Sequence, residues 1–308
     1  MEHTLYYHGK LLLTAEYFVL DGSTALAVPT KRGQRFVVRP LEADEPENLQ
    51  WHIHRVDQLS THYAFNLPAN QPTGAESDAV RSGLTRLFAA AERLRPGSTR
   101  ALYGQRVDCY LEFDATWGLG SSSTLVAFLG EYLEVDPYDL LAGWFGGSGY
   151  DIACARAGGP LRYRRVAPGL RPTVVPVDWN PDWLRFTYFV HRNRKQNSRE
   201  GIAAYRASPK RSRYLETLTH LTQGFLAATS LTEGMNLAFI HESVVARTLD
   251  LPPVQQELFP DFDGQIKSLG AWGGDFIWVF SRASAEVVRA YFNDRGYGTF
   301  IPYHDMIL

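Results

Sequence analysis

One segment near the middle of the sequence restricts the fold more than any other. Residues 107–114 (VDCYLEFD) alternate between apolar and polar side chains. This period of two indicates a strand with one buried face. The strand leads into the glycine turn of residues 118–123 (GLGSSS), and an apolar pattern with helical spacing follows through Leu133. We therefore expect a strand, a glycine turn and a hydroxyl-rich helix start in direct succession.

The glycine turn of residues 118–123 has the composition of an anion site. Glycine lets the backbone approach an anion closely, and a helix N-terminus offers N–H groups and the positive end of the helix dipole. Serine hydroxyls there can bond phosphate oxygens or join a Mg²⁺ shell. The turn is not a P-loop, because no lysine follows the glycines in that arrangement. An ordinary turn with a serine cap explains the same letters, so both interpretations stay open on this motif alone.

Three further motifs carry similar chemistry. Residues 9–16 (GKLLLTAE) place Lys10 at the start of an apolar strand, and residues 147–151 (GSGYD) place Asp151 at a turn that opens a short helix. Residues 264–276 form another glycine cluster before a strand. Each has an ordinary explanation, namely a surface lysine, a charge at a helix start and a tight turn. All of them in one chain, in this order, are harder to explain by chance.

The remaining patterns predict an α+β fold. Helical spacing covers 78–94, 211–228, 232–248 and 284–293, and extended patterns cover 35–38, 186–190, 276–280 and 299–303. Ser230 and Glu233 form a capping box at the start of one helix. Residues 41–50 read as an exposed connection, and the proline-rich residues 166–182 as a link between two halves. Strands and helices mix without regular alternation, which favours α+β over a doubly wound parallel sheet.

Composition narrows the class of protein. The 308 residues carry 31 Lys and Arg against 33 Asp and Glu, which gives no basic footprint for nucleic acid. The two cysteines lack any Cys-x-x-Cys or Cys/His spacing, which predicts no structural zinc site and no disulfide framework. We read no signal peptide and no apolar run near the roughly 20 residues of a membrane span. A cytoplasmic protein without a nucleic-acid or membrane partner is expected.

With these motifs in this order, the sequence resembles the GHMP kinases, the family of galactokinase, homoserine kinase, mevalonate kinase and phosphomevalonate kinase. The family's three motifs are matched by residues 9–22, 118–123 and 267–275. The sequences GSGYD and GGD are most similar to those of phosphomevalonate kinases. They also resemble a subgroup, the GYDIA-type kinases, named after the sequence found here at residues 149–153. The resemblance implies a ribosomal-S5-like N-terminal domain (1–170), a ferredoxin-like C-terminal domain (171–308) and an active site between them.

The resemblance also implies roles for single residues. Asp151 would be the base for the acceptor hydroxyl, and Lys10 would lower the pKa of that hydroxyl or stabilise transferred charge. ATP phosphates would lie on the backbone of Gly118, Leu119, Gly120, Ser121, Ser122 and Ser123, with Mg²⁺ at Ser122. Acceptor contacts would come from Glu16, Ser148, Gly149, Lys195, Ser198, Gly270, Ala271 and Gly273. The carboxylate ligand of Mg²⁺ stays open, with Glu131 and Asp139 among the candidates. Trp117 and Trp272 depart from the family pattern.

Alternatives remain open both for the acceptor and for the activity. Residues 191–199 hold four cations that suit an anionic acceptor such as phosphomevalonate or mevalonate, and a solvated charged loop explains them equally well. A homoserine or sugar kinase, a decarboxylase of the mevalonate diphosphate type and a non-catalytic nucleotide or metabolite sensor share the fold. Retention of Lys10 and Asp151 disfavours the sensor. The small-molecule substrate is the expected partner, and a homodimer remains open.

Overall fold

The structure of the chain, a computed structural model, describes residues 2–42, 48–56, 58–67, 78–144, 146–167, 170–194, 198–270 and 275–308. Contacts divide it into two compact units that interleave along the sequence. Unit 1 contains residues 1–9, 32–115 and 120–156, and unit 2 contains residues 10–31, 116–119 and 157–308. The division into domains at residue 170 stays a prediction.

Unit 1 is built on a sheet with the order β4-β3-β5-β2. These strands are β2 (Ala25–Pro40), which begins in unit 2, β3 (Leu49–Arg55), β4 (Gln58–Phe65) and β5 (Gln105–Leu111). Strand β1 (His3–Leu12) also pairs with β2. The β3–β5 pair is parallel, whereas β2–β5 and β3–β4 are antiparallel.

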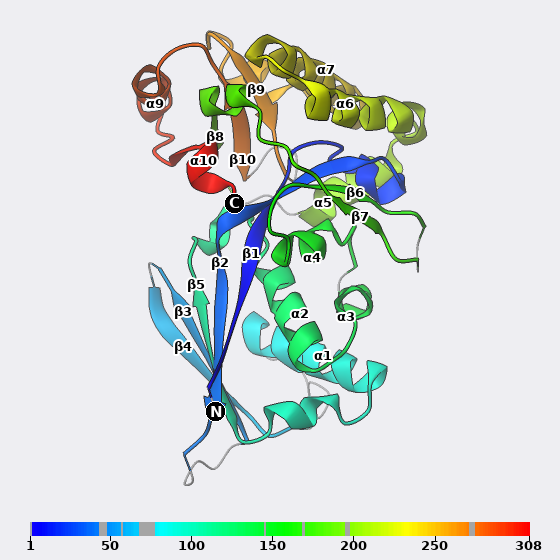
Figure 1. Cartoon of the computed structure of the whole chain (residues 1–308), viewed down its shortest axis with the longest axis vertical. Helices are drawn as coiled ribbons and strands as arrows, with labels where there is room; N and C mark the ends of the chain where they lie inside the picture. Colours follow the sequence, from blue (N-terminus) through cyan, green and yellow to red (C-terminus); the bar gives the residue numbers. More distant parts are fainter. Residues whose placement is uncertain are drawn as a thin grey trace. The chain divides into compact units, whose positions relative to one another are not determined.

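Helices cover one face of this sheet (Figure 1). They are α1 (Ala79–Leu94), α2 (Ser121–Tyr132), α3 (Pro137–Trp144) and α4 (Tyr150–Ala155). Asp78 caps α1 by accepting from the N–H groups of Val80 and Arg81. The core between helices and sheet is aromatic, and Phe36 of β2 stacks on Phe128 of α2 with ring centroids 4.1 Å apart.

Unit 2 contains an antiparallel sheet with the order β11-β8-β10-β9. Its strands are β8 (Thr187–His191), β9 (Gln265–Ser268), β10 (Phe276–Phe280) and β11 (Phe300–Pro302). The helices are α5 (Ser198–Ala207), α6 (Leu215–Ala227), α7 (Leu231–Leu249), α8 (Val254–Leu258), α9 (Ala285–Asn293) and α10 (Tyr303–Met306). Two short strands, β6 (Leu161–Arg164) and β7 (Thr173–Pro176), extend from the first residues of β2.

Both faces of the sheet in unit 2 are buried, as alternate residues of β10 show. Ile277 and Val279 pack in a cluster with Val288 and Phe292 of α9. Trp278 points to the other face and stacks on Phe225 of α6 at 5.6 Å between centroids. Every residue of β10 is therefore buried, which explains its unbroken apolar sequence.

The α+β class and the long helices are confirmed. Ser230 caps α7 by accepting the Glu233 N–H at 3.3 Å, as predicted, whereas the Glu233 carboxylate accepts from Thr229 N–H at 2.8 Å instead of completing the capping box at Ser230. Two further expectations need correction. Residues 49–50 belong to β3 rather than to an exposed connection, and residues 173–176 of the proline-rich link form β7. The continuous strand β2 contains Gly33, and only glycine fits there because a Cβ would meet the Tyr7 carbonyl oxygen at 2.2 Å. Both cysteines are buried free thiols.

Candidate active site

Lys10, on β1, is held against the first half of the glycine turn within unit 2. Its ammonium donates to the Gly118 carbonyl oxygen at 2.7 Å, and its backbone N–H donates to the Leu119 carbonyl oxygen at 3.0 Å. Trp117 anchors the same segment, because its ring packs edge-on against Phe276 with centroids 5.6 Å apart. The tryptophan before the turn therefore fixes residues 116–119 to the sheet of unit 2.

Asp275 brings two glycine motifs together in unit 2. Gly118 has φ +66°, and a Cβ there would lie 2.5 Å from the Asp275 carboxylate. Gly270 has φ +67°, and a Cβ there would lie 2.9 Å from Asp275 Oδ2. The carboxylate therefore fills the space that both glycines leave open, and neither position accepts a side chain without a shift.

Glu16 lies in a buried cluster rather than at a surface. Its Oε1 forms an ion pair with Lys267, which is fully buried, and its Oε2 lies 3.1 Å from His241 Nε2. The same His241 nitrogen accepts the Ala15 N–H at 2.8 Å. Burial raises the pKa of Glu16, and the charge of Lys267 acts in the opposite direction. Burial also lowers the pKa of His241 well below its usual value. The cluster ties the first motif to the third.

Glu242, the next residue on α7, is bound to the strand of the third motif. Its carboxylate accepts from Ser268 N–H at 3.0 Å and from Ser268 Oγ at 2.9 Å. Burial raises its pKa to about 7, with Lys267 acting in the opposite direction.

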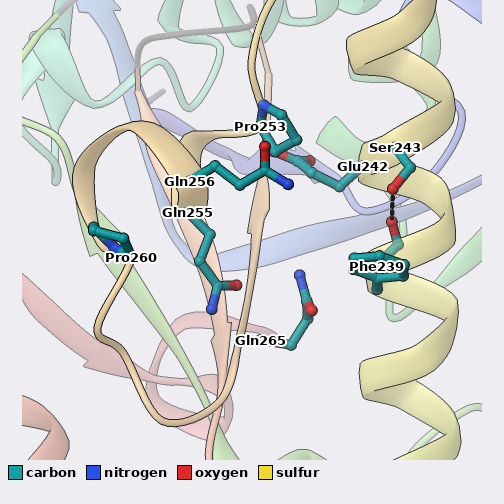
Figure 2. A pocket seen from close by; sticks show the side chains of 8 residues that line it. All are labelled: Phe239, Glu242, Ser243, Pro253, Gln255, Gln256, Pro260 and Gln265. Atoms are coloured by element: carbon teal, nitrogen blue, oxygen red, sulfur yellow. Dashed lines mark hydrogen bonds between the residues drawn. The ribbon is translucent and has the colours of Figure 1, made fainter.

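Beside Glu242 lies a cavity of about 300 Å³. Figure 2 shows its lining, in which the side chains of Glu242 and Ser243 from α7 face three glutamines across the opening. The lining consists of Phe239, Glu242, Ser243, Pro253, Gln255, Gln256, Pro260 and Gln265. No predicted site residue is among these.

The second half of the glycine turn and the predicted base belong to unit 1. Gly120, with φ +89°, is the N-cap residue of α2, and as a glycine it offers no side-chain cap to this helix. Ser123 Oγ, in the first turn of α2, donates a hydrogen bond to Asp151 Oδ2. Asp151 itself opens α4 after Gly149, whose φ is +84°. The structure therefore places the Asp151 carboxylate beside the N-terminus of α2.

The acidic candidates for Mg²⁺ take different positions. Ser122 is exposed in the first turn of α2, whereas Glu131 lies in its last turn, about 13 Å away at 1.5 Å per residue. Glu131 forms an ion pair with Arg156 and accepts from Tyr7 Oη at 2.6 Å. It therefore does not share an ion with Ser122 in this arrangement. Asp139 is exposed on α3, and Ser148 is partly exposed in the turn before α4.

Several predicted acceptor residues lie outside the described part of the chain. These are Lys195, Ala271 and Gly273, together with Trp272, and of Ser198 only its backbone at the start of α5 is described. Two cations of residues 191–199 are described. Arg194 is exposed, whereas Arg192 is buried, its pKa is lowered by that burial, and its Nε meets no acceptor among the described residues.

Sequence reasoning placed Ser123 in the phosphate loop but did not predict its bond to Asp151. It predicted no individual role for Lys267, His241 and Asp275, which organise these motifs. A signal existed for Lys267 and Asp275, since both lie within the third motif. His241 gave none, because a lone histidine on an apolar helix looks like an ordinary core residue.

Comparisons with known proteins agree with the fold. No family model matches the sequence, and no curated protein matches it. Among solved structures, it is similar to Streptococcus pneumoniae phosphomevalonate kinase in complex with phosphomevalonate and AMPPNP, at 15% identity and a TM-score of 0.69, with 97% of this chain and 99% of that chain covered.

Two other solved kinases match over nearly their whole length. Methanococcus jannaschii mevalonate kinase is 12% identical with a TM-score of 0.67, covering 96% of this chain and 95% of that chain. Lactococcus lactis galactokinase complexed with galactose is 11% identical with a TM-score of 0.67, covering 98% and 94%. The chain therefore has the two-lobed α+β fold of the GHMP kinases. No described helix has the length and apolarity needed to cross a membrane.

Proposed function

We propose that this chain is an ATP-dependent kinase of the GHMP type, which transfers the γ-phosphoryl group of ATP to a small anionic acceptor. The observation that carries the proposal is the hydrogen bond between Ser123 and Asp151. It sets a carboxylate against the first turn of the helix that follows the glycine turn. Next to a bound γ-phosphate, this carboxylate would accept the proton of the acceptor hydroxyl.

The start of α2 fits the phosphates of ATP. Gly120 adopts a positive φ that a side chain would strain, and as the N-cap residue it brings no side-chain cap to the helix start. Its first N–H groups and the positive end of its dipole would then bind phosphate oxygens. Bound ATP supplies the transferable phosphoryl group. Ser122, exposed at this helix start, offers the hydroxyl oxygen that Mg²⁺ accepts as a ligand.

Lys10 would supply positive charge at the other half of the glycine turn. Its bond to the Gly118 carbonyl oxygen holds the ammonium at the loop backbone. An ammonium in that place stabilises charge on a transferring phosphoryl group. Glu16 would act through its ion pair with Lys267, by holding the segment that follows β1 in place.

An anionic acceptor is favoured by the cations of residues 191–199. Arg192 is buried and its Nε lacks an acceptor among the described residues, so an anion would complete its hydrogen bonding. Phosphomevalonate and mevalonate lead as substrates, and the structurally similar S. pneumoniae enzyme is a phosphomevalonate kinase. Such a substrate would place the chain in isoprenoid biosynthesis. Free buried thiols fit the reducing cytoplasm as its compartment.

An acceptor panel tests this function. ATP turnover is measured with phosphomevalonate, mevalonate, homoserine and galactose, and the product is identified by mass spectrometry. We expect turnover that depends on one of the two mevalonate-type acceptors. Lys195→Ala and Arg192→Ala should each raise the acceptor KM about tenfold, the equivalent of one charge-assisted hydrogen bond. The exposed Arg213→Ala serves as the control. A sugar as best substrate, or two unchanged acceptor KM values, would reject the anionic acceptor.

A further inference from the structure

The sheet of unit 1 carries a group of polar side chains on the face away from its core. Trp51 and Ile53 of β3 pack in the core with Val107 and Cys109 of β5. Because side chains alternate along a strand, His52, His54 and Asp108 point to the opposite face. The parallel register pairs His52 directly with Asp108.

These three side chains offer ligand atoms to one point. One nitrogen from each histidine and one oxygen of Asp108 all lie within 4.8 Å of one another. His54 Nε2 is 3.1 Å from Asp108 Oδ1, and His52 Nδ1 is 3.6 Å from the same oxygen. Four ligands at about 2.0–2.1 Å from a tetrahedral zinc ion lie roughly 3.3–3.4 Å apart. The two measured distances lie on either side of this separation.

His52 has an unmet requirement that a cation would satisfy. Its Nε2 lies 3.2 Å from Gln50 Oε1, which can only accept, so Nε2 carries the proton. In the neutral ring, Nδ1 then presents a lone pair, and this buried atom has no hydrogen-bond partner among the described residues. It faces the Asp108 carboxylate, a second acceptor. Two lone pairs that face each other across a buried gap repel, and a metal ion between them would bind both.

The surrounding residues hold the ligands in orientation. His54 Nδ1 lies 2.8 Å from Ser60 Oγ, and its ring stacks on Tyr110 with centroids 4.4 Å apart. Donation from Nδ1 to Ser60 leaves Nε2 free to bind an ion, as outer hydrogen bonds do for metal-bound histidines. His62 lies edge-on to His52 at 4.2 Å between centroids.

Two arginines share the carboxylate. Arg39 Nη2 is 3.0 Å and Arg106 Nε is 3.1 Å from Asp108 Oδ2, and Arg106 Nη2 is 2.9 Å from Oδ1. These bonds occupy Oδ2 and one side of Oδ1. A bound ion would take the place of the proton between His54 Nε2 and Asp108 Oδ1. The two positive charges oppose a cation, so we expect weaker binding than at a closed structural zinc site.

We propose that His52, His54 and Asp108 form a binding site for a divalent transition-metal ion of the zinc class. Imidazole nitrogens with one carboxylate oxygen suit Zn²⁺, and Co²⁺ binds the same ligands. Three protein ligands leave a fourth position to water. The absence of cysteine motifs in the sequence does not bear on this site, because its ligands are histidine and aspartate on neighbouring strands. It stands apart from the Mg²⁺ proposed at Ser122.

Metal binding by the purified, chelator-treated full chain tests the site. Zn²⁺ is titrated by calorimetry, and Co²⁺ is titrated while the visible absorption of tetrahedral cobalt is recorded. We expect one equivalent to bind wild type and His8→Ala, a control that removes a partly buried histidine of β1 in the same unit. His52→Ala and His54→Ala should each weaken binding by about 100-fold or more. His54 is partly exposed, so its variant is expected to stay folded.

The thermal midpoint gives a second readout that does not depend on kinase activity. Zn²⁺ should raise the midpoint of wild type and His8→Ala and leave that of His54→Ala unchanged, since an ion that binds only the folded state stabilises it. Absence of Zn²⁺ and Co²⁺ binding to wild type would overturn the proposal. Equal binding by wild type and a folded His54→Ala would overturn it as well.

Discussion

A single methyl group added at Gly118 would probe the meeting of the glycine turn and the third motif. Gly118 has φ +66°, and the Asp275 carboxylate occupies the space next to its Cα. Asp275 is itself held by backbone bonds, since its N–H donates to Arg194 O at 3.0 Å and its carbonyl oxygen accepts from Arg192 N–H at 2.8 Å. In Gly118→Ala the carboxylate must therefore rotate, because the backbone that carries it is fixed.

The structure supplies a matched control for this change. Gly104 has nearly the same φ, +67°, with nothing within 4 Å of an added Cβ. Gly104→Ala should therefore lower the free energy of unfolding by about 1–2 kcal/mol, the cost of a left-handed backbone for a residue with a Cβ. In Gly118→Ala the new Cβ, 2.5 Å from the Asp275 carboxylate, must also displace that side chain. Holding a side chain off its preferred rotamer costs roughly 1 kcal/mol, so the loss of stability should be larger by about this amount. The double variant Gly118→Ala/Asp275→Ala removes that contact.

Urea unfolding measures these differences as free energies of unfolding, with an unchanged m-value as the sign of a comparable transition. We expect Gly118→Ala to lose more stability than Gly104→Ala. In a double-mutant cycle, Asp275→Ala should recover the excess in the Gly118→Ala background. Equal losses for the two glycine variants, or additive effects in the cycle, would refute the contact between Gly118 and Asp275.

Three other changes test neighbouring features. Burial raises the pKa of Glu242 to about 7, so the folded state holds a proton that the unfolded chain releases near pH 4.5. The free energy of unfolding should therefore fall by up to about 3 kcal/mol as the pH rises from about 4.5 to 7. In urea titrations, Glu242→Gln should reduce this dependence on pH. Lys267→Ala should lower the free energy of unfolding by about 3–5 kcal/mol, because it leaves Glu16 buried without its partner. Adding Glu16→Gln should recover part of that loss, and no recovery would count against the ion pair. Gly120→Val should weaken ATP binding in calorimetry, and unaltered affinity in a folded variant would contradict the phosphate site.

Periodic patterns in the sequence predicted most of the long elements. The apolar spacing of 78–94 and the box at Ser230 and Glu233 correspond to α1 and α7. The β3–β4 hairpin escaped prediction because residues 41–50 were read as an exposed connection, although the first two residues of β3 lie within that range. Gly33 lies within the continuous strand β2, where the close approach of β1 requires a glycine.

The candidate site could be predicted only as separate motifs. Residues 9–16, 118–123 and 147–151 were each visible because glycine and a charged residue interrupt an apolar pattern. Which serine faces Asp151 could not be predicted, because that depends on the rotation of α2 about its axis. The burial of Glu16 was equally hidden, because its partners Lys267 and His241 are more than 200 residues away in the sequence.

The most direct test of the account is the turnover of Asp151→Asn with the best acceptor. The substitution keeps the shape of the side chain and removes its capacity to take a proton. We predict that kcat falls by about 10²–10⁴, the usual contribution of a general base, while the affinity for ATP changes little. Asp294→Asn, at an exposed aspartate directly after α9 that has no predicted role, should leave kcat unchanged. Near wild-type turnover by Asp151→Asn would contradict the account.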